Sequence, residues 1–225
     1  MKRLMFVLFL FAAANMSAAW TAQKLADMLG DSGDALKAGK YAEALKLDDT
    51  IIEQMGEHYV SGDAAAQLLA IAVAHKALAL AGLGREEEAV WFWHSAIAIY
   101  PAIARSDMSM FGAPGRFLSE HRPEQIVSDA VAKGAHIEPP KTVTRVEPKY
   151  PSASLRDAAQ AAVVVECIIG TDGRVHAPHV TGDIPAPFIA YAALDALRQW
   201  RFTPATADGK PISVQYHITM TFKVR

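Results

Sequence analysis

Apolar and polar residues alternate without interruption over residues 212–225. A period of two is typical of a β strand with one buried and one exposed face. At about 3.3 Å per residue the predicted strand is about 45 Å long, and the other clear strand nearby, over residues 161–169, is shorter. We therefore expect part of its backbone edge to lack an internal partner and to be open for pairing with another chain. The candidate partner-binding residues on its polar face are Gln215, His217, Thr219 and Thr221.

Residues 21–100 have a different pattern, with Ala and Leu at spacings of three and four, which predicts helices. Residues 39–45 recur loosely as residues 84–90, and the second copy continues to Pro101. This resembles a tetratricopeptide repeat, in which two antiparallel helices pack closely. We predict a tetratricopeptide-like helical domain over residues 20–133, completed by a helix after Pro123 or by a partner. Such a domain binds peptides or serves as a scaffold, and the sequence leaves both open.

Two apolar features of this region are informative. The run over residues 64–83 is long enough to suggest a membrane span, but it contains His75 and Lys76 and has no flanking positive charge, so we predict a buried helix. Residues 91–93 are Trp, Phe and Trp in succession and cannot all face one core, so we expect one of them to be exposed as a contact.

The first nineteen residues have the order of a secretory signal peptide: Lys2 and Arg3, an apolar run, then small residues at 17–19. The apolar run is shorter than the roughly twenty residues that a span needs. We predict cleavage after Ala19 and export, with an uncleaved membrane anchor as the alternative. Cys167 is the single cysteine, so no internal disulfide can form, and its place among apolar strand residues predicts an inert, buried thiol.

The formal net charge of −2 conceals an asymmetry between the two halves. Residues 20–140 contain ten Lys or Arg against seventeen Asp or Glu, whereas residues 141–225 contain ten against seven. Neither half has the concentrated basic surface, interleaved with aromatic residues, that is needed to grip a phosphate backbone. We therefore do not expect a nucleic-acid partner.

Four prolines between Gly134 and Pro151 predict an extended linker over residues 134–150. The following module, residues 151–225, contains a strand at 161–169, an Asp-Gly turn, a strand at 174–180, a helix at 187–199 and the alternating final strand. We predict an α+β fold: a three-stranded antiparallel sheet in the order second, first, third, covered by one helix. Pro178 in the second strand fits this order because proline is tolerated at a sheet edge.

These residues resemble the C-terminal domain of TonB, the periplasmic energy transducer of outer-membrane transport. The resemblance covers residues 147–225 and depends on Tyr150 and Pro151, on the alternation over 163–169 and on several motifs. It implies that the final strand receives the TonB box, an extended segment of an outer-membrane receptor plug, with Tyr150 and Pro151 as further candidate partner-binding residues. The motif residues that we expect to be structural are Asp172, Gly173, Trp200, Phe202, Pro204 and Gly209.

The sequence also departs from the family pattern. Full transducers carry a serine and a histidine in an N-terminal anchor that couple to the ExbB and ExbD motor, whereas the first histidine here is His58, which argues against motor coupling. A helical domain and a short linker also replace the long proline-rich spacer. Two alternatives stay open: a periplasmic scaffold that forms a homodimer through the sheet edge, and an inner-membrane anchored transporter component.

The sequence contains no nucleophile motif, glycine-rich phosphate loop or metalloprotease helix, so we predict neither an enzyme nor a cofactor. His176 and His179 are the closest approach to a metal motif. On a regular strand, residues three apart project to opposite faces, so we expect this pair not to bind a metal.

Overall fold

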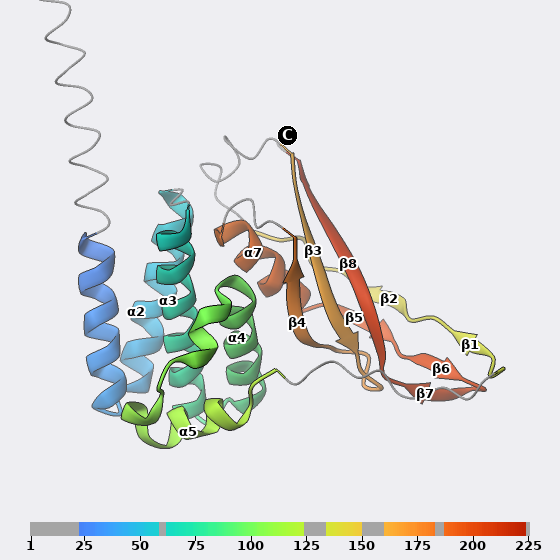
Figure 1. The fold of residues 1–225 in the computed structure, drawn as a ribbon, viewed down its shortest axis with the longest axis horizontal. Coiled ribbons are helices and arrows are strands. Elements are labelled where there is room, and N and C mark those ends of the chain that lie inside the picture. Colours follow the sequence, from blue (N-terminus) through green and yellow to red (C-terminus); the bar gives the residue numbers. More distant parts are fainter. Residues whose placement is uncertain (1–22, 59–61, 124–133, 150–159, 183–186, 224–225) are drawn as a thin grey trace, which may run out of the picture.

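The computed structural model describes residues 23–58, 62–123, 134–149, 160–182 and 187–223 (Figure 1). Helices form one side of the molecule and strands the other, with helix α7 between them. The predicted signal peptide, the helix expected after Pro123, and the candidate residues Tyr150 and Pro151 lie outside the described residues.

The helical side contains a helix over residues 23–37, α2 (Tyr41–Glu57), α3 (Asp63–Gly82), α4 (Glu86–Ile99), the 3₁₀ turns η1 (Pro101–Arg105) and η2 (Ser109–Phe111), and α5 (Gly112–Glu120). Gly39 and Gly84 have φ of 73° and 74°, a left-handed conformation that favours glycine, and each precedes a helix of a pair. The two copies in the sequence therefore make the same turn. Classification of these helices as tetratricopeptide repeats stays a prediction.

Helix α3 is the central helix of this side and packs against α2, α4, α5 and α7. Among the described residues it is the one helix long and apolar enough to cross a membrane, but most of it is buried in protein. Lys76 is neutralised at its surface by Asp49, 2.6 Å away, and lies 4.2 Å from the centre of the Phe92 ring. The apolar composition of α3 is thus explained by its place in the core.

The aromatic triplet of α4 differs from expectation. Trp91, Phe92 and Trp93 are all buried, with at most 8% exposure. Helix α4 packs against α3 and also against the strand β4 (Val175–Thr181) and α7 (Pro187–Leu197), so neighbours cover it on several sides. The prediction of an exposed aromatic contact was wrong because the second domain could not be placed from the sequence.

The strands form three small sheets rather than one. The main sheet has the order β4-β3-β8, with β3 at Gln160–Ile169 and β8 at Val214–Lys223, and both neighbouring pairs are antiparallel. A second sheet has the order β1-β6-β7, and a third pairs β2 with β5. Their bounds are β1 Ile137–Glu138, β2 Lys141–Thr144, β5 Arg201–Thr203, β6 Ala205–Ala207 and β7 Lys210–Ile212.

The segment expected as a linker is folded onto the C-terminal module. Strand β1 pairs with β6, and β2 pairs with β5. The indole Nε1 of Trp200 donates to the carbonyl of Val146 at 2.9 Å, and the backbone N–H of His136 donates to Asp208 at 2.9 Å. The proline content did predict an extended chain, but hydrogen bonds to partner strands hold residues 137–144 in place.

Helix α7 is buried on all sides, since every residue except Asp195 is buried. One side faces the main sheet and the other faces α2, α3 and α4. Gly56 of α2 allows this approach, because a Cβ there would lie 2.5 to 2.8 Å from ring atoms of Phe188. Buried residues of both halves form one continuous hydrophobic core. The sequence predicted one helix covering a sheet, and the structure adds a second layer of helices behind it.

Candidate partner-binding edge

Strand β8 lies at one end of the main sheet and pairs with β3 along its whole length. The register runs from Val214 opposite Ile169 to Lys223 opposite Gln160. The predicted strand over 212–225 is interrupted, because Ile212 belongs to β7, and β8 does not outrun β3. The open edge is therefore not explained by the length of the strand, as we expected. It is open because β8 is the last strand of the sheet, and among the described residues no strand pairs with its far side.

Two contacts show which backbone groups of β8 face that open side. The Cys167 thiol on β3 lies 3.6 Å from the Tyr216 carbonyl, which therefore points toward β3. The Val164 carbonyl accepts from Thr181 on β4 and so points away from its β8 partner Thr219. In an antiparallel strand the N–H and C=O of one residue point to the same side, and successive residues alternate. The outward groups are those of Gln215, His217, Thr219 and Thr221.

The side chains of these four residues are exposed on one face of the sheet, as the alternation predicted. Gln215 donates a hydrogen bond to Glu166 on the neighbouring strand. His217 is also directly opposite Glu166, which in turn is opposite His179 of β4. A strand added beside β8 would thus meet a polar face that carries two imidazoles and one carboxylate that is already hydrogen-bonded.

The other face of β8 anchors the strand in the core. Ile218, Met220 and Phe222 are 5% exposed or less. The Tyr216 ring makes an edge contact with Phe202 of β5, with 6.1 Å between the ring centres. The strand is therefore fixed from within while one of its edges stays open.

The opposite end of the main sheet is closed to a similar pairing. Helix α4 packs against β4, and Arg174, just before β4, binds Glu87 of α4 at 2.9 Å. Within β4 the backbone is irregular, with Ala177 at φ 44° followed by Pro178, which has no N–H to donate. Of the two ends of this sheet, the β8 end alone combines a regular strand with an unoccupied edge among the described residues.

The motif residues Asp172 and Gly173 build the turn between β3 and β4. The Asp172 carboxylate accepts from the backbone N–H of Arg174 at 2.9 Å and from His176 at 3.1 Å, and these contacts lower its pKa despite partial burial. Gly173 has φ 73°, and a Cβ there would collide with the carbonyl of Phe202. The Gly173 carbonyl accepts from the Phe202 N–H at 2.9 Å, so this glycine joins the turn to β5.

The remaining motif residues hold the small sheets together. Trp200 is 5% exposed, and besides its bond to Val146 its ring lies 5.1 Å from the Arg145 guanidinium. Phe202 is buried in β5, and Pro204 separates β5 from β6. Gly209, with φ 77°, forms the tight turn between β6 and β7. These positions have structural contacts that the motif alone could not specify.

His176 and His179 do not lie as predicted. Glu166 and Ile168 of β3 are two positions apart, but their β4 partners His179 and His176 are three positions apart, so β4 contains a bulge. The extra residue in β4 places both histidines on the same, exposed face of the sheet. Across the described part of the chain no three His, Cys, Asp or Glu residues are arranged to hold a metal ion. Cys167 is buried as predicted, and burial raises its pKa to about 12.

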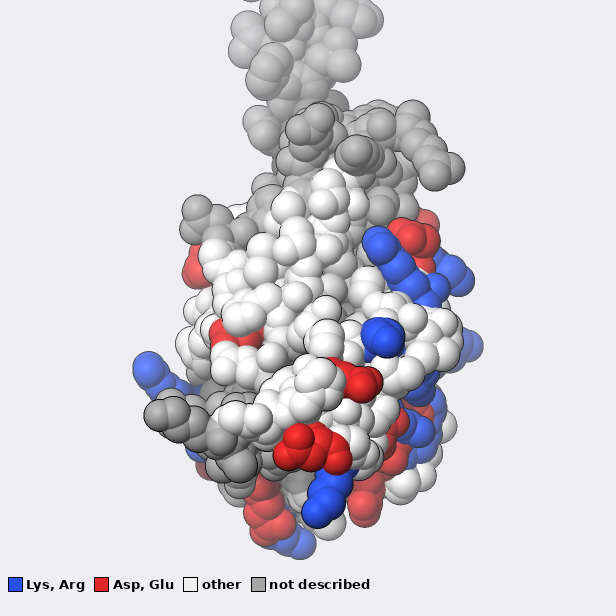
Figure 2. All heavy atoms as spheres, turned by 90° about the vertical axis from the view of Figure 1, so that its right-hand side faces the viewer, with Lys and Arg blue, Asp and Glu red and all other residues white. Residues whose placement is uncertain are grey.

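Figure 2 shows the strand side of the molecule. Residues other than Lys, Arg, Asp and Glu cover most of its centre, and the charged side chains lie mainly toward the margins. Two of the exposed large apolar side chains belong to this side: Ile137 of β1 and Val143 of β2, the latter 65% exposed. This face has the weakly charged character of a protein contact surface rather than of a phosphate-binding surface.

Residues 146–224 match the family described as Gram-negative bacterial TonB protein C-terminal. The chain is also 26% identical over 80 residues to the protein TonB of Vibrio cholerae serotype O1, which covers 36% of this chain and 33% of that protein. The predicted resemblance to TonB C-terminal domains is confirmed for this segment, and the chain spans about a third of the length of that relative.

Proposed function

We propose that this protein is a TonB-like component of energy-coupled transport in the cell envelope, because its residues 146–224 match that C-terminal family. Its partner is an extended segment of an outer-membrane receptor plug or of another envelope protein. The segment adds to the main sheet as a strand beside β8. The observation that carries this proposal is the regular β8 edge, which no other described strand pairs with, at one end of a sheet whose other end packs against α4.

The expected interaction is weak. The outward N–H and C=O groups of four residues offer about eight backbone hydrogen bonds at most, and each contributes a net of about 0.5 to 1.5 kcal/mol. Association itself costs about 4 to 15 kcal/mol. A transient contact follows, with selectivity supplied by the polar side chains along the edge. Weak binding suits a protein that must release its partner in each transport cycle.

A proline substitution at an outward position tests strand addition directly. Thr219→Pro removes an N–H that points to the open edge, and it spares the bonds to β3 because proline is tolerated at an edge. The double variant Thr219→Pro with His217→Pro loses two edge contacts. We expect it to bind a peptide copied from a receptor plug about tenfold more weakly than the unchanged protein does. Calorimetric titration measures the affinity, and circular dichroism checks that the sheet is retained.

Thr219→Val is the matched control because it keeps the backbone N–H and the branched shape while it removes the hydroxyl. The valine variant should bind nearly as well as the unchanged protein. Equal binding by the proline and unchanged proteins would exclude the β8 edge. Equal loss in the proline and valine variants would show that side chains rather than the backbone carry recognition.

The second candidate function is a periplasmic scaffold that forms a homodimer through the same edge, favoured by the small number of charged side chains over the centre of the strand side. Light scattering distinguishes the two. A dimer that Thr219→Pro converts to a monomer supports the scaffold, and a monomer that binds peptide supports the transducer-like role. Mass spectrometry of the mature N-terminus then decides between an exported, cleaved protein and an inner-membrane anchored one that could couple to ExbB and ExbD.

A further inference from the structure

An exposed histidine, His217, lies near the middle of the open β8 edge. Within the described ranges its ring forms no hydrogen bond or ion pair. The sequence of β8 contains no Asp or Glu. A strand that adds beside β8 therefore meets an imidazole with free nitrogen atoms and no carboxylate on the strand itself.

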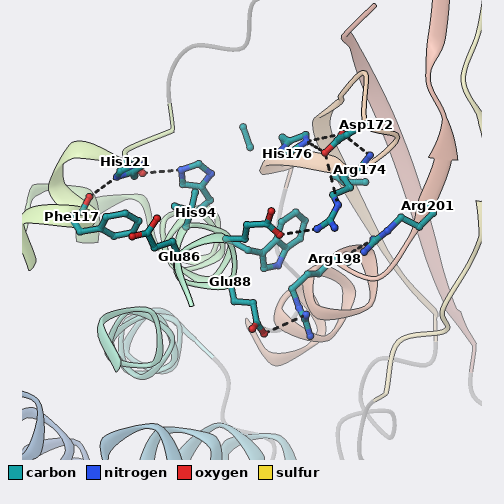
Figure 3. A pocket seen from close by; sticks show the side chains of 15 residues that line it. Glu86, Glu88, His94, Phe117, His121, Asp172, Arg174, His176, Arg198 and Arg201 are labelled. Atoms are coloured by element: carbon teal, nitrogen blue, oxygen red, sulfur yellow. Dashed lines mark hydrogen bonds and ion pairs between the residues drawn. The ribbon is translucent and has the colours of Figure 1, made fainter. Parts of the chain in front are cut away.

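The other end of the main sheet is different. Near β4 several charged side chains line a cleft at the junction of the two halves, and some of them pair with one another (Figure 3). Arg174 binds Glu87 of α4 at 2.9 Å, and the Asp172 carboxylate accepts from the ring of His176 at 3.1 Å. These four groups already have partners within the chain, whereas the imidazole at the β8 edge does not.

His217 is also the last member of a row of titratable residues that crosses the main sheet. Glu166 of β3 lies directly opposite His217 on one side and directly opposite His179 of β4 on the other. Residues that are directly opposite each other share a face of the sheet, and neighbouring strands are about 4.8 Å apart. When the imidazoles are protonated, the charges along this row are positive, negative and positive. The next position in the row belongs to whatever strand adds at the open edge.

We infer that the segment captured at β8 carries an Asp or Glu beside His217, an inference that rests on the proposed strand addition. In either orientation of the added strand, the residue beside His217 places its side chain on the same face of the sheet. A carboxylate there accepts from the imidazole and continues the alternation of charge, whereas a lysine or arginine meets a like charge. The ring of His217 is free for this contact, because the Glu166 carboxylate accepts from Gln215 rather than from His217.

An NMR titration of the full chain tests this preference with nine-residue peptides of alternating threonine and valine that have Glu, Gln or Lys as the fifth residue. Histidine ordinarily gains its proton near about pH 6.5 and glutamate near about pH 4.3, so an imidazole and a carboxylate are both charged at pH 5.5. At that pH we expect the Glu peptide to bind about threefold more tightly than the Gln peptide, and the Lys peptide to bind more weakly than either. At pH 8 the preference should largely disappear.

Two variants separate the edge histidine from the rest of the row. His217→Gln keeps a polar side chain but removes the titratable ring, so it should bind the three peptides with nearly equal affinity at both pH values. His179→Gln is the matched control, because it makes the same change on β4, at the far end of the row from the added strand. This variant should retain the preference for Glu.

The outcomes distinguish this inference from the strand addition on which it rests. Equal binding of the Glu and Gln peptides to the unchanged protein at pH 5.5 would overturn the inference and leave strand addition intact. A preference for Glu that persists in His217→Gln would overturn it as well. If none of the peptides shifts the backbone resonances of β8 at either pH, strand addition itself fails, and the inference fails with it.

Discussion

A fragment that contains only residues 134–225 should be far less stable than the full chain. Removal of the helical side exposes the outer face of α7, where Phe188 packs against Gly56 and Tyr191 lies near α2. Burial of each such aromatic side chain is worth about 1.5 to 3 kcal/mol, a large share of the roughly 5 to 15 kcal/mol that holds a domain folded. We expect a lower urea midpoint and strong binding of the dye ANS.

A pair of glycine substitutions in the full chain tests the same interface without truncation. Gly56→Ala places a Cβ against the Phe188 ring and should destabilise the protein, whereas Gly30→Ala meets no atom within 4 Å and should stabilise it by about 0.5 to 1 kcal/mol. Cooperative unfolding of the fragment at the urea midpoint of the full chain would contradict the shared core.

A second large effect is expected at Asp48, a carboxyl group of α2 with 0% exposure. Ser32 donates to its Oδ1 at 2.7 Å, His75 of α3 lies 3.2 Å from the same hydroxyl, and the Asp48 Oδ2 has no partner within the described ranges. Burial raises the pKa of Asp48 to about 8, opposed by the Ser32 bond, and burial lowers the pKa of His75 to about 4. Both groups are therefore uncharged near neutral pH.

The direction of the pH dependence follows from these values. Asp48 binds a proton more tightly when folded, so its contribution to stability is lost as pH rises from about 4 to about 8. His75 has the opposite effect, because its pKa is lower when folded. Its contribution makes the stability rise with pH between about 4 and its unfolded pKa of about 6.5, and is constant above that. Between pH 6.5 and 8 Asp48 alone of these two groups lowers the stability, by at most about 1.4 kcal/mol per pH unit and by about half of that near pH 8. Asp48→Asn should abolish this decline in urea unfolding measured at pH 6.5, 7.25 and 8.

Asp49→Asn is the matched control because Asp49 is the neighbouring carboxylate but is exposed and paired with Lys76. This variant should retain the alkaline decline of the unchanged protein. A decline that persists in Asp48→Asn would mean that another group loses its proton, and the buried network of Ser32, Asp48 and His75 would then not control stability above neutral pH.

Local patterns predicted the elements that depend on one periodicity. The alternation near the C-terminus predicted β8 and its four exposed polar residues, and the apolar run over 64–83 predicted the buried helix α3. The Asp-Gly pairs at 172–173 and 208–209 both form turns between strands. These predictions were correct because each depends only on residues close together in the sequence: a period of two, an apolar run, or a glycine that can adopt the left-handed conformation.

Features that depend on distant contacts could not be predicted in this way. Nothing local to α7 indicates that its second side packs on α2, and a proline-rich segment carries no sign of its pairing with β5 and β6. The bulge at Ala177 places His176 and His179 on the same face, because one extra residue moves every following side chain to the opposite face. The cleft at the junction is invisible for the same reason, since its walls are separated by about eighty residues.

The complete register between β3 and β8 has a mechanical consequence for the proposed role in energy-coupled transport. Ladder hydrogen bonds lie perpendicular to the strands. Tension along the axis of β8 would load the bonds of all ten residue pairs together in shear, whereas tension across the sheet would open them one after another from an end. The β8 strand should therefore stay bound to β3 under a lengthwise pull and separate from it under a sideways one, so that the direction of the force decides whether the sheet holds.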